Sequence, residues 1–88
     1  MLTSSARMQI MRERLQEAFA PTALEIIDDS DKHKGHAGSR DGAGHYTVQI
    51  AAKSLAEKSR VDAHREIYVV LNDLIPLEIH ALIIRILS

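Results

Sequence analysis

The fold is decided by residues 46–87, which read YTVQIAAKSLAEKSRVDAHREIYVVLNDLIPLEIHALIIRIL. At the start of this stretch, Tyr46, Val48 and Ile50 alternate with polar residues, and this period of two predicts a β-strand. At its end, the Ile- and Leu-rich run over 77–87 predicts another strand. The residues between these runs have helical patterning, and a helical crossover joins strands that are parallel. We therefore expect two parallel strands in one sheet, with a right-handed connection.

Two capping motifs organise that connection. Ser54-x-x-Glu57 and Ser59-x-x-Asp62 each place a hydroxyl and a carboxylate where they can bind the free N–H groups at a helix start. The first motif is expected to open a short helix, and the second a longer helix that Pro76 ends. The residues expected to share one apolar face of the longer helix are Val61, His64, Ile67, Tyr68, Leu71 and Leu74.

The residues before 46 add a helix and a strand. Apolar residues recur at helical spacing between Met8 and Phe19, which predicts an amphipathic helix that stops before Pro21. The residues that can cap its start are Thr3, Ser4 and Ser5. Alternation over 23–28 predicts a strand, and the segment 31–44, which holds all four glycines, predicts a long loop. The strands that flank this loop are expected to form an antiparallel hairpin.

These elements predict an α+β domain in the order helix–strand–strand–short helix–helix–strand, with the helices on one face of a three-stranded mixed sheet. The length of 88 residues suits a single domain over 1–88. The net charge of −1 and the 3% aromatic content argue against a strong nucleic-acid binder. The chain has no Cys, which excludes a disulfide scaffold, a cysteine nucleophile and a metal site built from its own thiolates.

The sequence contains no motif for a familiar enzyme or for membrane insertion. It has no Walker loop, dinucleotide fingerprint or nucleophile elbow. No apolar stretch approaches the length of a membrane span, and the first residues do not read as a secretory signal. We therefore expect a cytoplasmic protein that is not an enzyme and has no membrane partner.

Three of the five histidines lie in or beside the long loop, namely His33, His36 and His45. Three imidazoles could bind a zinc or iron ion without a partner protein. Loop histidines are also commonly just solvated, and their spacing does not separate the two interpretations.

The other two histidines, His64 and His80, lie on the elements around the crossover. His64 falls on the expected apolar face of its helix, which favours a structural imidazole in the core. His80 shares strand parity with Leu82 and Ile84, whereas Arg85 falls on the opposite face. Both faces of this strand are largely apolar, so parity leaves a structural role and a ligand role for His80 open.

The order of these elements, together with several strings, resembles the BolA family. The strings are Leu15-x-x-Ala18-Phe19-x-Pro21, Asp28-Asp29-Ser30, Gly35-His36-Ala37-Gly38, Gly44-His45-Tyr46-x-Val48, His64-Arg65-x-x-Tyr68-x-x-Leu71 and Ile79-His80-Ala81-Leu82. They cover nearly the whole chain. Two segments depart from the family pattern: Ala63-His64-Arg65 stands where the family usually reads Arg-His-Arg, and Leu55-Ala56-Glu57 stands where it reads Phe-x-Gly.

The resemblance implies an α-β-β-α-α-β fold similar to class II KH domains. It also implies a non-enzymatic adaptor that pairs with a monothiol glutaredoxin and shares a bridging [2Fe-2S] cluster with it, in iron–sulfur trafficking or iron regulation. On this resemblance His80 is one ligand, and His36 is the other, with His33 as its rival. The glutaredoxin cysteine and glutathione would complete the cluster, so the isolated protein is expected to hold none.

A second function is a KH-like nucleic-acid-binding transcriptional regulator of the stress response, because BolA proteins have also been discussed as regulators. The basic residues that would contact DNA are Lys53, Lys58, Arg60 and Arg65. The two departures fall in the segment likened to a helix-turn-helix, so they weaken this alternative more than the adaptor function. A homodimer is a further candidate assembly, because the last strand could pair with another copy through its edge.

Overall fold

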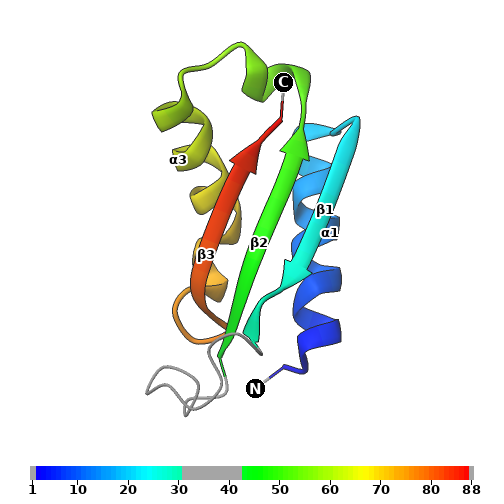
Figure 1. Ribbon diagram of the computed structural model, residues 1–88, viewed down its shortest axis with the longest axis vertical. Helices are drawn as coiled ribbons and strands as arrows, with labels where there is room; N and C mark the ends of the chain where they lie inside the picture. Colours follow the sequence, from blue (N-terminus) through cyan, green and yellow to red (C-terminus); the bar gives the residue numbers. More distant parts are fainter. Residues whose placement is uncertain (1, 31–42, 88) are drawn as a thin grey trace.

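The computed structural model describes residues 2–30 and 43–87. Three strands form one sheet, and the helices lie together on one of its faces (Figure 1). The elements are α1 (Ser4–Phe19), β1 (Ala23–Asp28), β2 (Gly44–Ala51), α2 (Lys53–Ala56), α3 (Arg60–Leu71), the 3-10 turn η3 (Asn72–Leu74) and β3 (Ile79–Ile86). The predicted α+β class and the predicted order of elements are confirmed.

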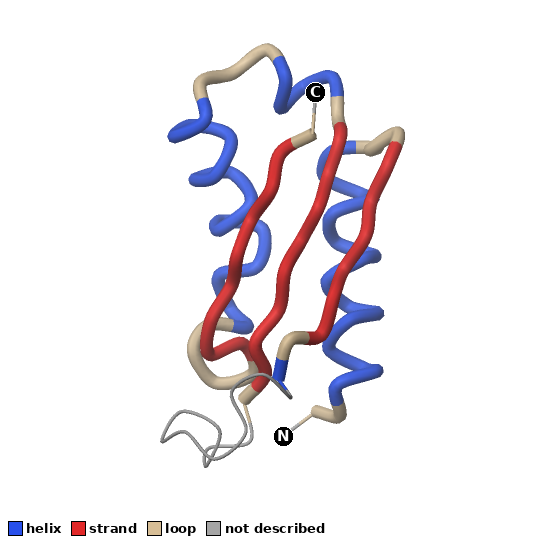
Figure 2. Tube along the Cα trace, in the orientation of Figure 1, coloured by secondary structure: helices blue, strands red, loops and turns tan. Residues whose placement is uncertain are grey.

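The sheet has the order β1-β2-β3, with β2 in the centre. β1 pairs antiparallel with β2, and β3 pairs parallel with β2, as expected for a hairpin followed by a helical crossover. The three strands run side by side along the long axis of the molecule, with α1 and α3 behind them (Figure 2). Of the long loop predicted over 31–44, residues 31–42 lie outside the described residues, and Gly44 is the first residue of β2.

The helix boundaries confirm two predicted caps and correct a third. The Thr3 hydroxyl accepts a hydrogen bond from the N–H of Ala6, and the Ser59 hydroxyl accepts one from the N–H of Asp62. α1 ends in Ala20, which has the left-handed φ of 45° that closes many helices. The prediction that Ser54 caps α2 is wrong, because Ala52 is the N-cap, two residues earlier, and the helix has no side-chain cap.

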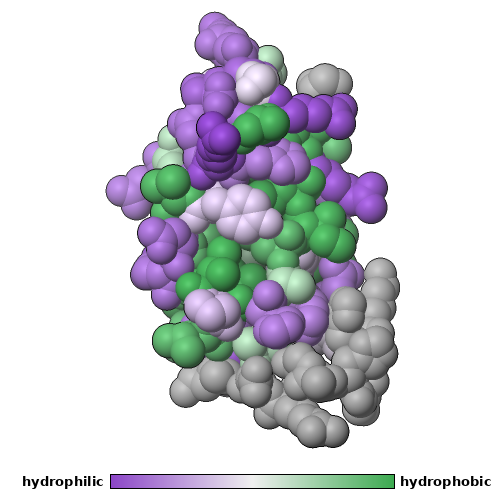
Figure 3. Space-filling model, turned by 90° about the vertical axis from the view of Figure 1, so that its left-hand side faces the viewer, coloured by the Kyte–Doolittle hydropathy of each residue, from purple (hydrophilic) through white to green (hydrophobic). Residues whose placement is uncertain are grey.

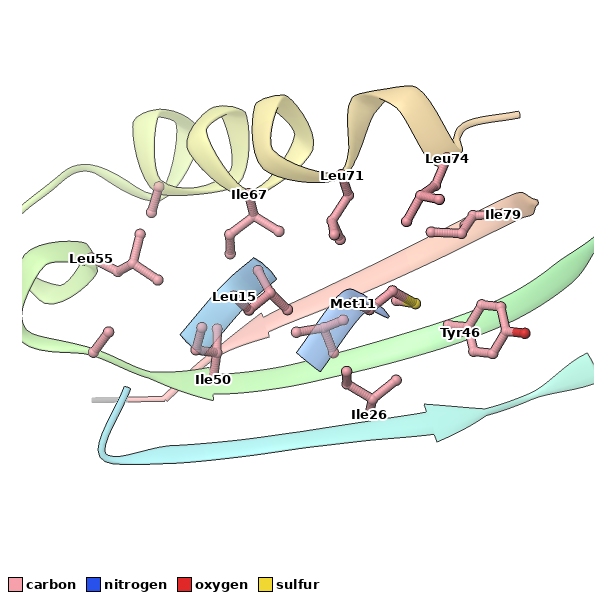
Figure 4. Packing of buried hydrophobic residues seen from close by; sticks show 13 residues of the cluster. Met11, Leu15, Ile26, Tyr46, Ile50, Leu55, Ile67, Leu71, Leu74 and Ile79 are labelled. Atoms are coloured by element: carbon pink, nitrogen blue, oxygen red, sulfur yellow. The ribbon is translucent and has the colours of Figure 1, made fainter. Parts of the chain in front are cut away.

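The core lies between the sheet and the helices. Figure 4 shows Ile67, Leu71 and Leu74 pointing from α3 and η3 toward residues of the strands and of α1. The labelled strand and α1 residues of this cluster are Met11, Leu15, Ile26, Tyr46, Ile50 and Ile79. Close packing of these side chains accounts for most of the hydrophobic stabilisation of so small a domain.

The predicted apolar face of α3 is partly wrong. The buried residues of this helix are Ala63, Ile67 and Leu71, which recur at every fourth position. Val61 is 59% exposed and Tyr68 is 41% exposed, so both lie to the side of this stripe. Ala63 is only 1% exposed, so it belongs to the buried face, which the predicted apolar stripe left out.

Candidate functional site

His80 is exposed at a break in the pairing of β2 with β3. Gly44 faces Ile79, but the next residue of β2, His45, faces Ala81, so His80 is the extra residue of a β-bulge. Ile79, just before the bulge, is fully buried, whereas His80 is exposed. Parity grouped His80 with Leu82 and left its orientation open; Leu82 packs against the core, whereas His80 is exposed because the bulge interrupts the alternation of side chains.

The ring of His45 lies beside the ring of His80. Their centroids are 5.1 Å apart and the rings are inclined by 55°. His45 is only 6% exposed, so it supports one side of the His80 ring from within the protein. The sequence placed His45 in a loop-histidine set with His33 and His36. Its closeness to His80 could have been found only by pairing the starts of the two parallel strands.

The backbone of His45 is fixed by the chain that follows β1. The N–H of His45 donates to the Ser30 hydroxyl at 3.1 Å, and its carbonyl accepts from the N–H of Asp29 at 2.7 Å. The hydroxyl of Thr47 donates to the Asp29 carboxylate, and both residues are buried. These contacts hold the chain that leads into 31–42 against the start of β2, beside the two histidines.

A buried ion pair fixes the start of β3. The Nε of Arg7 donates to the Oε1 of Glu78 at 2.9 Å, and Arg7 is only 4% exposed. The N–H of Leu2 also donates to this carboxylate at 2.9 Å. The hydrogen bond from Arg7 is the main cause that lowers the pKa of Glu78 below its ordinary value. α1 therefore holds a residue that lies two positions before His80.

The backbone of Glu78 is held as firmly as its side chain. Its carbonyl accepts from the N–H of Gly44 at 3.0 Å, and its N–H donates to the carbonyl of Leu74 at 2.8 Å. We call Arg7 and Glu78 with these contacts the Arg7–Glu78 clamp. It joins α1, β2 and η3 at the point where β3 begins, so the position of His80 is set by the packed domain and does not depend on a free loop.

Gly44 is required by the packing of Tyr46. A Cβ atom on Gly44 would lie 2.3 Å from the Tyr46 ring, which is inside any tolerable contact distance. Tyr46 is 1% exposed, and its hydroxyl lies 3.0 Å from the Ser4 hydroxyl. Ser4 also donates to the Asp28 carboxylate. Burial raises the pKa of Asp28, but hydrogen bonds from Ser30 and Ser4 outweigh it, so the net shift of this pKa is downward.

The remaining histidines are His33, His36 and His64. His33 and His36 lie outside the described residues. His64 is half-buried on α3 and lines a surface hollow with Arg85, so the prediction of a core imidazole is wrong. It misses the core because the buried stripe of α3 runs through the neighbouring Ala63.

The predicted nucleic-acid residues lie on α2, on α3 and in the turn between them. In Figure 1 this region is at the opposite end of the sheet from the start of β3. Lys58 pairs with Glu66 at 3.2 Å, and Arg65 pairs with Asp62 at 3.8 Å. These acids offset part of the local positive charge. The remaining predicted residues of this set are Lys53 and Arg60.

The described residues do not by themselves make a complete metal site. Within residues 2–30 and 43–87, no group of three or more His, Cys, Asp or Glu side chains could hold a metal ion. What this part of the chain presents is one exposed imidazole supported by a buried one. A metal held by His80 would therefore need further ligands from residues 31–42 or from another molecule.

The arrangement defines a class of protein: a small α+β domain with an α-β-β-α-α-β order, which carries an exposed histidine on the bulged start of its edge strand. A family model described as BolA-like protein matches residues 15–88. The BolA domain of SufE1 from Arabidopsis thaliana superposes with a TM-score of 0.78 at 34% identity, covering 97% of this chain and 93% of that one. BolA1 from the same plant gives 0.76 at 31% identity, covering 91% and 88%.

Curated relatives give the same assignment. An uncharacterised protein from the cobS 5′ region of a Sinorhizobium species is 40% identical over 75 residues, covering 83% of this chain and 76% of that protein. The chloroplastic protein BOLA1 of Arabidopsis is 37% identical over 79 residues, covering 86% of this chain but 49% of its own length. The DNA-binding transcriptional regulator BolA of Escherichia coli K12 is 32% identical over 72 residues, covering 82% and 66%.

This chain belongs to the BolA-like family. It spans about half of the chloroplastic relative and 21% of the SufE-like protein 1 of Arabidopsis, so these relatives have further regions of their own. In the described part of the chain, no helix is both long and apolar enough to cross a membrane.

Proposed function

We propose that this protein is a non-enzymatic adaptor that pairs with a monothiol glutaredoxin and contributes His80 to a bridging [2Fe-2S] cluster. The single observation that carries the proposal is the exposed position of His80 on a bulge. A structural histidine would be turned inward and satisfied by the protein, whereas this ring stands at the surface of an edge strand. The role in iron–sulfur trafficking or iron regulation is inferred from the family resemblance.

The composition of the chain agrees with a shared cluster. A [2Fe-2S] cluster is usually held by thiolates, and this protein has none, so a partner has to supply the sulfur ligands. A glutaredoxin cysteine and glutathione supply that sulfur, and this chain supplies nitrogen. Histidine ligation gives the cluster a higher reduction potential than ligation by cysteine alone.

The residues around His80 suit a fixed ligand. His45 supports the ring, and the Arg7–Glu78 clamp holds the strand that carries it. Leu77, which directly precedes Glu78, is 71% exposed, and Ile83 on β3 is 52% exposed. These apolar side chains offer contact area to a partner near the histidine. The second ligand from this chain is His36 or His33, which the family resemblance places on the hairpin tip.

Anaerobic assembly with a monothiol glutaredoxin, glutathione, iron and sulfide tests the proposal. Visible circular dichroism distinguishes a heterodimer cluster from the cluster of a glutaredoxin homodimer. We expect a new spectrum with the wild-type protein, and reversion to the homodimer spectrum with His80→Ala. His64→Ala is the matched control. His64 is half-buried and lies near the start of α3, away from His80, so its substitution should leave the spectrum unchanged.

The same assay assigns the second ligand. His36→Ala and His33→Ala are compared with the wild type, and the residue whose loss changes the heterodimer spectrum is the ligand. A heterodimer spectrum that is identical in the wild type and in His80→Ala contradicts the proposal.

A second function, that of a KH-like nucleic-acid-binding transcriptional regulator, is favoured by one finding: a relative at 32% identity is named a DNA-binding transcriptional regulator. In this chain the binding residues would be Lys53, Lys58, Arg60 and Arg65. A gel-shift titration of a DNA duplex at two salt concentrations tests it, because phosphate contacts make the affinity fall steeply with salt. Retention of the duplex shift in the Lys53→Glu/Arg60→Glu variant would contradict this assignment.

A further inference from the structure

The open edge of β3 ends in a hollow that the proposed glutaredoxin function does not use. This hollow has a volume of about 290 Å³ and lies between the start of α3 and the end of β3. We call it the α3–β3 groove, and its lining residues are Arg60, His64, Ile84, Arg85, Ile86 and Leu87. A second hollow of about 220 Å³ shares Arg60, Ile86 and Leu87 with it and is also lined by Leu55 and Ala56 of α2.

The backbone of β3 presents unused hydrogen-bonding groups to this groove. The N–H of Leu87 donates to the carbonyl of Ile50, so Leu87 and every second residue before it face β2. The residues between them, Leu82, Ile84 and Ile86, therefore direct their N–H and C=O groups outward. β3 is an edge strand, and such groups are a ready template for one more strand.

The edge is closed at one point and open beyond it. The hydroxyl of Tyr68 donates to the carbonyl of Leu82 at 3.2 Å, so α3 covers this part of the edge. Beyond it, Ile84 and Ile86 line the hollow. An added strand is thereby limited to the end of β3, over a few residues, and is kept away from His80.

Charge and side-chain parity specify the added strand. In the described part of the chain, Arg60 and Arg85 form no ion pair, and the groove lining contains no acid. Ile84 and Ile86 pack against the core, so Arg85 between them faces the opposite, helix-free side of the sheet. An added strand of alternating residues would place apolar side chains toward the groove and acidic side chains beside Arg85.

The surrounding surface supports a protein partner. Figure 3 views the side of α3 and of the β3 edge, and hydrophobic surface lies in the middle of this face, below a largely hydrophilic upper part. Val61 and Val69, both on α3, are 59% and 71% exposed. Exposed apolar side chains that gather on one face are typical of a protein-binding surface.

We propose that the α3–β3 groove binds an extended segment of a partner protein in which acidic and apolar residues alternate, by adding it as a strand to the end of β3. The proposal does not rest on the glutaredoxin function. His80 and Ile86 lie about 20 Å apart along β3, at about 3.3 Å per residue. The two binding sites are therefore at opposite ends of one edge strand.

A titration of the uniformly ¹⁵N-labelled protein tests this proposal. The probe is the peptide acetyl-Ser-Val-Glu-Val-Glu-Val-Ser-amide, and ¹H–¹⁵N correlation spectra report on each backbone amide. We expect the largest shifts at Ile84 and Ile86, with little change at His80. Arg85→Glu should raise the dissociation constant of the peptide by at least about tenfold, because it reverses the charge beside the glutamate side chains. Arg12→Glu, an exposed residue of α1, is the matched control and should bind as the wild type does.

Two control peptides test the contributions of charge and of backbone pairing separately. A peptide with Lys in place of Glu should bind at least about tenfold more weakly if charge selects the partner. A peptide that is N-methylated on alternate residues keeps the side chains but loses the strand pairing, and it should not shift Ile84 or Ile86.

Several results would overturn the proposal. These are no shift at millimolar peptide, equal affinity for the Glu and Lys peptides, or shifts centred on residues 44–47. Shifts at Ile84 and Ile86 caused by a DNA duplex, with none caused by the Glu peptide, would assign the groove to nucleic acid and would equally overturn it. Well-dispersed spectra of the free variants show that they are folded, so a loss of binding reports on the groove.

Discussion

At the scale of single residues, the bulge at His80 is what places the side chain of a strand histidine at the protein surface. Without the extra residue, His80 would share the core face with Leu82, as its parity indicates. With it, Ile79 stays buried while the imidazole stands outside, against the buried ring of His45. The sequence offers no sign of this change, because a bulge inserts no special residue here. It becomes visible only in the register of the two strands.

Gly44→Ala tests how tightly this end of the sheet is packed. The new methyl group would overlap the ring of Tyr46, which is too deeply buried to move freely. We expect the free energy of unfolding, measured by urea denaturation, to fall by about 1–3 kcal/mol. In a Tyr46→Leu background the same substitution should cost much less, because the overlapping atoms are gone. An equal cost in both backgrounds would show that the Tyr46 ring is not the cause.

At the scale of secondary-structure elements, the sequence predicts the helices and strands better than it predicts which of their side chains are buried. The periodicity of two over 46–50 and over 23–28 gave both strands of the hairpin, and Ser59 marked the start of α3. The pattern of α3 was ambiguous, because Val61 and Tyr68 are apolar residues that lie outside the core. Hydrophobicity alone cannot tell an apolar core residue from an apolar surface residue.

Contacts between distant elements were not predictable. The Arg7–Glu78 clamp joins residues 71 positions apart, and no sequence motif around either residue identifies the other as its partner. Arg7 falls on the buried side of α1, where a charge is unfavourable unless it is paired. An arginine at a core position of an amphipathic helix was the available signal, and it indicates a buried partner without identifying it.

The clamp predicts a pH dependence of stability. The pKa of Glu78 is lower in the folded protein than in the unfolded chain. Its carboxylate therefore contributes its full stabilisation above the unfolded-state pKa of about 4.3, and this contribution is lost as the pH falls through the lower folded-state pKa. Urea denaturation between about pH 6 and about pH 3 should show a steeper loss of stability for the wild type than for Glu78→Gln.

Arg7→Met provides the second arm of this experiment. Removal of the cation should flatten the pH dependence in the same way, and the double variant should add little to either single change. If Glu78→Gln loses stability with falling pH as steeply as the wild type does, other carboxylates, such as Asp28 with its lowered pKa, cause the acid sensitivity.

At the scale of the whole molecule, the domain is an elongated body of 39 × 20 × 19 Å. Its long axis follows the strands, so the start of β3 and the end of β3 lie at opposite ends (Figure 1). His80 belongs to the first end, and the α3–β3 groove belongs to the second. Their separation exceeds the distance of about 8–10 Å over which exposed charges interact at physiological salt.

This geometry predicts that the two ends act independently. Arg85→Glu should leave the visible circular dichroism of the glutaredoxin heterodimer unchanged, while it weakens peptide binding. His80→Ala should do the reverse. A change in both readouts from either single variant would show that the two ends of β3 are coupled.

The central claim is that an imidazole of this chain binds the shared cluster, and pulsed electron paramagnetic resonance tests it most directly. The heterodimer is assembled from ¹⁵N-labelled protein and unlabelled glutaredoxin and glutathione, and its cluster is reduced by one electron. We predict ¹⁵N hyperfine couplings of directly bound imidazole nitrogen, which are reduced or lost in His80→Ala and retained in His64→Ala. A heterodimer cluster without such couplings, or with couplings unchanged in His80→Ala, would contradict the account.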